Sequence, residues 1–162
     1  MKFDKMTDLT VRRAVVDDTE SIAVFNERMA WETERLTLEA QRLRQGVREV
    51  LSNPAKGFYL VAEAGGALAG QLLITFEWSD WRNGAFWWIQ SVYVGEAFRR
   101  TGVFRALFAE VERLASLDPG VCGLRLYVEQ DNERAQHTYR SLGMTTTRYR
   151  VMEIDRVFTR GD

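Results

Sequence analysis

The run Arg99-Arg100-Thr101-Gly102-Val103 carries the clearest chemical signal in this chain. It lies between an apolar stretch that is typical of a strand and an apolar-periodic stretch that is typical of a helix. Free amides at a helix start, a glycine that allows close approach to the backbone, and adjacent guanidinium groups favour the binding of a phosphate or pyrophosphate. A polar turn with two solvated arginines fits the same spacing equally well. The sequence contains neither the Gly-Lys-Ser/Thr ending of a nucleotide P-loop nor a G-x-G-x-x-G run.

Hydrophobic periodicity and turn residues predict the elements that position this run. In chain order they are a strand over 10–14, helices from Asp17 and from near Thr37, strands over 58–62, 68–76 and 85–94, a helix from 101 or 102 to about 115, a strand over 123–128, a helix over 132–142 and a closing strand over 144–152. The order βααβββαβαβ predicts a mixed α/β (α+β) fold with a central sheet of about six to seven strands and helices on both faces.

Three local details complete this prediction. Asp17 with Glu20 is typical of a capping box that opens the first helix. Residues 30–36 are expected to form a short connection that carries two carboxylates, and residues 78–84 a polar loop. Because no linker or internal repeat interrupts the chain, we expect one domain over residues 1–162 with its core at about 10–152.

Composition excludes several classes of protein. The 22 basic residues nearly balance the 23 acidic ones, which removes the cationic field that nucleic acids or anionic membranes need. The apolar runs are far shorter than the ~20 residues of a membrane helix, and the N-terminus lacks a signal-peptide pattern. The single cysteine, Cys122, and the single histidine, His137, cannot supply a disulfide or a structural zinc site. A cytoplasmic protein with no metal, nucleic-acid or membrane partner is expected.

Two motifs give the sequence a specific resemblance. Residues 89–94 followed by 98–103 resemble the central acyl-CoA-binding motif of the GCN5-related N-acetyltransferases (GNAT), R/Q-x-x-G-x-G/A after a strand. Asn132-x-x-Ala135-x-x-x-Tyr139-x-x-x-Gly143-Met144 resembles a later motif of the same superfamily, and the element order matches from Thr10 to Met152. The resemblance implies a GNAT fold and acetyl-CoA as cosubstrate. Phe104 departs from the pattern, which has Gly or Ala there.

The resemblance also implies roles for individual residues. The amides of residues 100–103, with Arg99, would hold the CoA pyrophosphate, and the backbone of Val92 and Val94 would pair with the pantetheine arm. Tyr139 would give its proton to the departing thiolate, against the simpler interpretation of a core aromatic residue. The residues assigned to the cosubstrate are Val92, Tyr93, Val94, Arg99, Arg100, Thr101, Gly102, Val103, Phe104, Asn132 and Ala135.

The acceptor amine must lose a proton before it can attack. Gln90 stands where many relatives carry Glu; a glutamine cannot act as a base, but it can position a water. The carboxylates available near the acceptor side are Glu32, Glu34, Glu77 and Asp80. Glu32 is the candidate that we favour as the base, and four solvated loop charges remain the alternative.

Tryptophans gather around the hairpin over residues 68–94. Trp78, Trp81, Trp87 and Trp88 belong to it, and Trp31 follows the first helix. Cross-strand packing accounts for Trp87 or Trp88, while the others could form an apolar or cation-binding wall for the acceptor. The predicted substrate-binding residues are therefore Trp31, Glu32, Glu34, Glu77, Trp78, Asp80 and Trp81.

These observations predict an acetyl-CoA-dependent N-acetyltransferase that acetylates a primary amine of a small molecule by direct transfer in a ternary complex. A protein N-terminal or lysine acetyltransferase is one alternative, and a noncatalytic acyl-CoA-binding sensor is another. Gln90 and Phe104 leave the sensor open as an alternative, whereas Tyr139 argues against it. The sequence leaves open whether exposed strand edges pair into a homodimer.

Overall fold

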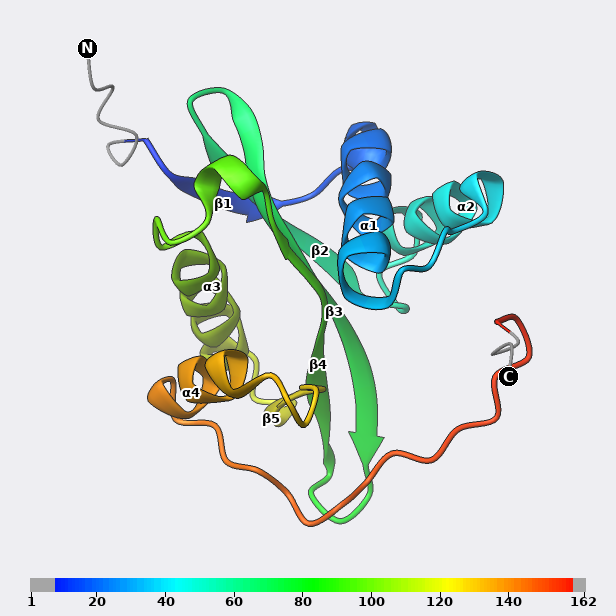
Figure 1. Cartoon of the computed structure of the whole chain (residues 1–162). Helices are drawn as coiled ribbons and strands as arrows, with labels where there is room; N and C mark the ends of the chain where they lie inside the picture. The colour runs from blue at the N-terminus through cyan, green and yellow to red at the C-terminus, as the bar shows by residue number, and fades with distance from the viewer. Residues whose placement is uncertain (1–7, 159–162) are drawn as a thin grey trace. The chain divides into compact units, whose positions relative to one another are not determined.

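The computed structural model describes residues 8–158 (Figure 1). Its strands are β1 (Thr10–Arg13), β2 (Phe58–Ala64), β3 (Ala67–Ser79), β4 (Gly84–Val94) and β5 (Val121–Leu126). Its α-helices are α1 (Thr19–Glu34), α2 (Ala40–Ser52), α3 (Val103–Leu117) and α4 (Glu133–Ser141), with 3-10 turns η1 (Val16–Asp18) and η2 (Glu96–Phe98). The strands form one sheet in the order β1-β2-β3-β4-β5, antiparallel except for the parallel pair β4 and β5.

The chain divides into two compact units between Tyr127 and Val128. The first unit holds the whole sheet together with α1, α2 and α3, and the second holds α4 and the segment that follows it. The mixed α/β fold with helices on both sheet faces is confirmed. The described residues form five strands, which is fewer than the number expected from the sequence.

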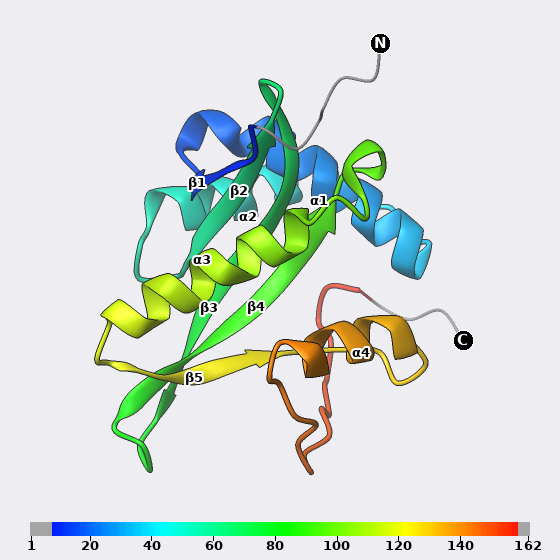
Figure 2. The ribbon, with the colours of Figure 1, turned by 90° about the vertical axis from the view of Figure 1, so that its left-hand side faces the viewer.

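Helices cover both faces of the sheet in the first unit, and Figure 2 shows α3 crossing one face with α1 and α2 behind the other. Successive strand residues point to opposite faces, so each strand serves two cores. On the α1 and α2 face, Tyr59 and Val61 of β2 pack with the buried Ile22 and Val47. On the α3 face, Leu60 belongs to the second core.

The predicted closing strand over residues 144–152 is wrong. These residues form no strand in the described structure, and most of their side chains are exposed, including Tyr149 at 80% and Met152 at 94%. A strand exists only when its backbone groups pair with a neighbouring strand, and the alternating sequence pattern does not supply that neighbour.

Two predictions about α1 are also wrong. Its N-cap is Asp18 rather than Asp17, and the cap has no side-chain hydrogen bond. The Asp18 carboxylate instead accepts hydrogen bonds from the two terminal nitrogens of Arg12, at 2.8 and 2.9 Å, and from the amide of Val15. The helix also continues to Glu34, and its C-cap Arg35 adopts the left-handed conformation, so Glu32 and Glu34 lie in a helical turn and not in a loop.

The Arg12–Asp18 pair predicts a pH-dependent stability. The hydrogen bonds from Arg12 hold the pKa of Asp18 below its ordinary value. A carboxyl group whose pKa is lowered in the folded state stabilises the protein at pH values above its unfolded-state pKa. That contribution is lost as the pH falls through the folded-state pKa. We expect Asp18→Asn to lower the free energy of unfolding at neutral pH by roughly 1–2 kcal/mol, and this difference should vanish at low pH.

Thermal unfolding followed from pH 7 to about pH 2 measures this effect, since the ordinary pKa of Asp lies near 3.9. Asp17→Asn is the matched control, because Asp17 is exposed and adjacent in sequence. A destabilisation by Asp18→Asn that stays constant over the whole pH range would contradict the assignment.

Candidate functional site

Strands β4 and β5 separate partway along β4, at the β5 edge of the sheet. Their last paired residues are Ile89 and Leu126, after which β5 ends while β4 continues to Val94 beside β3. The amide of Gly95 donates to the carbonyl of Ala69 at 2.9 Å, so by alternation Val92 and Val94 direct their backbone groups away from β3. Within the first unit this leaves a stretch of β4 edge that an extended chain can pair with.

A bulge in β4 produces the change of direction. Gln71 and Leu73 of β3 face Tyr93 and Gln90, so β4 holds one residue more than β3 over this interval. Ser91, inside the bulge, adopts a positive φ of 49°. The fully buried Gln71 donates its side-chain NH₂ to the Ser91 carbonyl at 3.3 Å and to Asn26 at 2.9 Å. The buried side-chain amide of Gln71 therefore stabilises the bulge and links it to α1 through Asn26.

The loop before α3 leaves the first backbone amides of the helix without helical partners. The N-cap of α3 is Gly102, with φ 87° and no side-chain hydrogen bond, and Arg100 before it also has a positive φ of 64°. The first-turn amides of an α-helix have no partner within the helix. A Cβ placed on Gly102 would meet nothing within 4 Å, so the space above the loop is open. The predicted helix start is confirmed to within a residue or two.

Arg99 and Thr101 are bound to protein groups in this loop. The Arg99 guanidinium donates to the Glu32 carboxylate at 2.7 Å and to the Val94 carbonyl at 3.1 Å. The Thr101 hydroxyl donates to the Phe98 carbonyl at 2.6 Å. Arg99 and Arg100 are both exposed. Phe104, in the first turn of α3, is partly exposed, and its ring packs against Phe108 with ring centroids 6.1 Å apart. The Phe104 ring thus packs within α3.

Glu32, Tyr93 and Arg99 form a hydrogen-bonded group that joins the end of α1 to β4 and to the loop. The Tyr93 hydroxyl donates to Glu32 at 2.9 Å, and the Tyr93 ring packs on Phe25 of α1. These hydrogen bonds, from Tyr93 first and then Arg99, lower the pKa of Glu32. Burial and the bond to Glu32 raise the pKa of Tyr93. Glu32 is therefore a weaker proton acceptor than a free carboxylate.

A second polar group lies farther along the same sheet face. Glu77 accepts from the Trp88 indole at 2.6 Å and from Arg125 at 3.0 Å, so this carboxylate is bound in an ion pair separate from that of Glu32. Trp88 also stacks on Tyr127, with ring centroids 4.4 Å apart.

Gln90 lies on the same face. Its side-chain NH₂ donates to the Thr75 hydroxyl. Gln90 is half-buried, and a side-chain amide oxygen can accept a hydrogen bond from an amine or a water.

The tryptophans do not share one surface. Strand alternation places Trp78 on the α3 face and Trp88 on the face of α1 and α2. Trp81 is 86% exposed at the hairpin turn, and Trp31 is exposed at the end of α1 beside Arg35. Trp78 and Trp88 therefore cannot form a common wall.

Two of the predicted acceptor carboxylates lie at the surface. The Asp80 carboxylate accepts from the amide of Trp81 within its own turn. Glu34 is exposed in the last turn of α1.

The second unit contains the later motif on α4. The side chain of Asn132 caps the helix by accepting from the amide of Ala135 at 3.0 Å. Ala135 and Tyr139 are half-buried one helical step apart, and burial raises the pKa of Tyr139. Gly143 has φ 90° and ends the helix, as its position predicts.

Sequence reasoning missed Gln71, Arg125 and Tyr127. Gln71 interrupts an apolar strand, and a buried amide inside such a run is a recognisable sign of a specific hydrogen-bonding task. Arg125 and Tyr127 alternate with apolar residues, and this pattern indicates that their side chains share one sheet face. It does not identify the residues of neighbouring strands that they contact.

No helix within residues 8–158 is long and apolar enough to cross a membrane. The same residues contain no group of three His, Cys, Asp or Glu side chains arranged to hold a metal ion.

A family pattern and a related sequence both point to acetyltransferases. The sequence pattern of the family described as "Acetyltransferase (GNAT) family" matches residues 16–144. A Mycothiol acetyltransferase from Corynebacterium aurimucosum is 28% identical over 132 residues, which are 79% of this chain. The match spans only 43% of that longer protein.

Solved structures agree in fold. "A possible acetyltransferase from Clostridium difficile 630" is 41% identical, with a TM-score of 0.85 over 93% of this chain and 99% of that one. An aminoglycoside acetyltransferase from an uncultured soil metagenomic sample, in complex with sisomicin, is 14% identical, with a TM-score of 0.70 over 93% of this chain and 97% of that one. The latter likeness shows the fold alone.

Proposed function

Because this chain belongs to the GNAT acetyltransferase family, we propose that it transfers an acetyl group from acetyl-CoA to a primary amine of a small molecule. Two neighbouring features of the first unit support the proposal: the open glycine loop at the start of α3, and the edge of β4 beyond Ile89, with which β5 does not pair. A pyrophosphate and an extended pantetheine arm need these two features side by side.

The residues of the first unit fit such a cosubstrate. The amides at the start of α3 and the exposed Arg100 would bind the pyrophosphate, while Arg99, fixed by Glu32, would add positive charge beside it. Val92 and Val94 would pair with the amide groups of the pantetheine arm. The Val94 carbonyl already accepts from Arg99, so the pairing would use the remaining outward groups of this edge.

The chemistry needs one acid and one proton acceptor. Acetyl-CoA supplies an acetyl thioester when it is bound. The neutral amine forms a new N–C bond to the acetyl carbon as the C–S bond breaks, and the phenol of Tyr139 would give its proton to the leaving sulfur. Its raised pKa keeps this phenol protonated at neutral pH, as an acid must be. The assignment of Tyr139 rests on the motif and on this protonation state.

The contacts of Glu32 favour positioning over proton transfer. Its two hydrogen-bonding partners weaken it as a base and tie it to the anion-binding loop. We therefore propose that the ammonium proton leaves to a water that binds the Oε1 of Gln90, and that Glu32 holds Arg99. The substrate side of the site would comprise the sheet face around Gln90, Glu77 and Trp88.

Replacing Glu32 by glutamine tests this assignment. Loss of the ion pair should free Arg99 and raise the KM for acetyl-CoA by roughly fivefold, the size expected for a partly exposed pair. The dependence of kcat on pH should keep its shape. Initial rates over a range of pH measure both effects, with Glu34→Gln as the control at the same helix end. A flattened alkaline rise in kcat would identify Glu32 as the base instead.

An amine panel tests the activity itself. Purified protein with acetyl-CoA and each amine should release free thiol, and initial-velocity patterns that intersect would support direct transfer in a ternary complex. Acetylation of peptide N-termini or lysines in preference to small amines would favour the protein-modifying alternative. Saturable acetyl-CoA binding with no thiol release from any amine would favour a sensor.

A further inference from the structure

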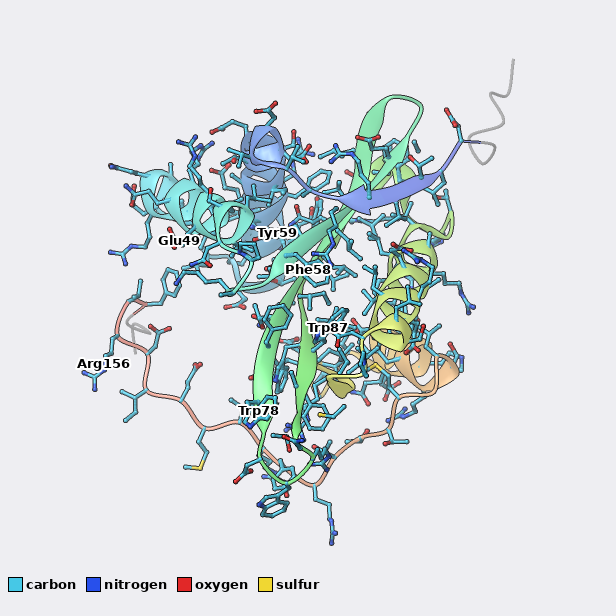
Figure 3. The ribbon with its side chains drawn as sticks, turned by 180° about the vertical axis from the view of Figure 1, so that it is seen from behind. Glu49, Phe58, Tyr59, Trp78, Trp87 and Arg156 are labelled. Carbon is cyan, nitrogen blue, oxygen red and sulfur yellow. The ribbon has the colours of Figure 1, made fainter. Side chains whose placement is uncertain are left out.

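A hollow lies on the sheet face that carries α3. Its floor is formed by Phe58, Phe76 and Trp87, one from each of the three central strands, and its volume is about 410 Å³. Figure 3 shows Phe58, Trp87 and Trp78 following one another along the sheet. Trp78 lines the hollow and is 64% exposed. Pockets that bind small molecules have volumes of roughly 300–1,000 Å³ and mostly apolar walls.

This hollow is separate from the site described above. Trp87 and Trp88 are neighbours in β4 and point to opposite faces. Trp88 bonds to Glu77 on the face of α1 and α2, whereas Trp87 packs at a ring distance of 5.3 Å from Phe58 on the other face. The sheet itself therefore lies between the hollow and Gln90.

Arg13 supplies a positive charge at one end of the hollow. Its guanidinium lies 3.8 Å from the centre of the Phe58 ring, and within residues 8–158 the structure gives it no hydrogen-bond or ion-pair acceptor. Glu110 acts on Arg13 electrostatically, but both of its oxygens accept from Arg113, at 2.7 and 2.8 Å. A guanidinium that lies over a ring can still direct N–H groups from its edge to bind a carboxylate in a fork.

Asp118 lines the opposite end. Arg13 belongs to the edge strand β1, and Asp118 precedes β5 at the other edge of the sheet. One oxygen of Asp118 accepts from the amide of Gly120 at 2.8 Å. Its second oxygen can accept a hydrogen bond from a donor, and its negative charge repels a carboxylate from this end. The hollow thus has an aromatic floor, an anion-binding end and a donor-binding end.

We propose that this hollow is a second ligand site, distinct from the acetyl-transfer site, which binds a small aromatic carboxylate that carries a hydroxyl or N–H donor on its ring. The ring packs between Trp87, Phe76 and Trp78, where aromatic side chains give large contact area and favourable edge contacts. The carboxylate receives the edge N–H groups of Arg13, and the ring donor bonds to Asp118. The site is independent of the proposed acetyltransferase activity.

The test uses 4-hydroxyphenylacetate as the probe, followed by tryptophan fluorescence excited at the red edge of the indole band, where the probe does not absorb. We expect saturable binding with a Kd on the order of 0.1–1 mM. Arg13→Gln should weaken binding of the probe about tenfold and leave the neutral ring analogue p-cresol within about twofold. Asp118→Asn should weaken the binding of 4-hydroxyphenylacetate more than the binding of phenylacetate, which lacks the hydroxyl.

Arg105→Gln is the matched control, because Arg105 is an exposed arginine on α3. It should leave binding of the probe unchanged, and Arg13→Gln should leave thermal protection by acetyl-CoA unchanged, which separates this site from the acetyl-transfer site. Absence of saturable binding, or equal losses in the two arginine variants, would overturn the proposal. Sedimentation that shows a dimer dissociated by Trp78→Ser, with no binding of the probe, would assign the hollow to a second copy and would also overturn it.

Discussion

Replacement of Tyr139 by phenylalanine is expected to lower kcat about 100-fold or more, which is the usual contribution of a general acid. The Kd for acetyl-CoA should change less than about twofold, because the ring remains and only the proton is lost. Stopped-flow or steady-state thiol release measures kcat, and calorimetry with acetyl-CoA measures the affinity. Since burial raises the pKa of this phenol, the alkaline decline in wild-type kcat should begin only above about pH 10, the ordinary pKa of tyrosine.

Tyr149→Phe is the control for this experiment. Tyr149 is 80% exposed beyond α4, so the same loss of a hydroxyl there should leave kcat and affinity near wild type. A Tyr139→Phe variant whose turnover and acetyl-CoA affinity fall together would show that Tyr139 shapes the binding site and does not transfer a proton.

Replacement of Gly102 by valine should remove the thermal protection that acetyl-CoA gives. At about 100 times Kd, a ligand adds roughly 2.7 kcal/mol to the free energy of unfolding, or about 5–10 °C in Tm for a chain of this size. A β-branched residue is strongly disfavoured at φ 87°, and its side chain would enter the space from which a phosphate approaches the amides. The shift in Tm with acetyl-CoA should therefore fall to within about 1 °C of zero.

Gly66→Val separates the effect of backbone strain from the effect of blocking the space above the amides. Gly66 has φ 78° in the β2–β3 turn, and a Cβ there also meets nothing within 4 Å, so valine brings similar backbone strain far along the chain from the loop. This variant should lose some stability without ligand and keep the full acetyl-CoA shift. Retention of the shift in Gly102→Val would mean that the cosubstrate binds elsewhere.

The proposed anion site was the part of the molecule most accessible to sequence reasoning. A strand, a glycine loop and a helix follow one another within residues 84–117, so their order fixes the geometry locally. Glycine at 102 has the positive φ that this residue type favours, and the helix begins immediately after it. Asn132 and Gly143, by contrast, mark the ends of α4 by the same local rules, but local rules do not orient α4 toward any partner.

The contacts of Glu32 show where sequence reasoning stopped. The residue was expected in a loop as a base, yet the helix runs two residues past it and places it 2.7 Å from an arginine 67 positions later. The tryptophans were also beyond sequence reasoning, because the strand register decides to which sheet face the Trp78 side chain points. The predicted closing strand failed because a β pattern does not establish a neighbouring strand.

The sequence by itself determined the order of elements from β1 to α4, the two family motifs and the loop before α3, since helix and strand periods and turn residues act over a few neighbouring positions. The tertiary structure decided which carboxylate binds Arg99, where β4 leaves β5, and how the aromatic side chains divide between the two faces. Those features depend on strand register, and register depends on pairing between distant segments: one extra residue at the Ser91 bulge turns every later side chain of β4 to the opposite face of the sheet.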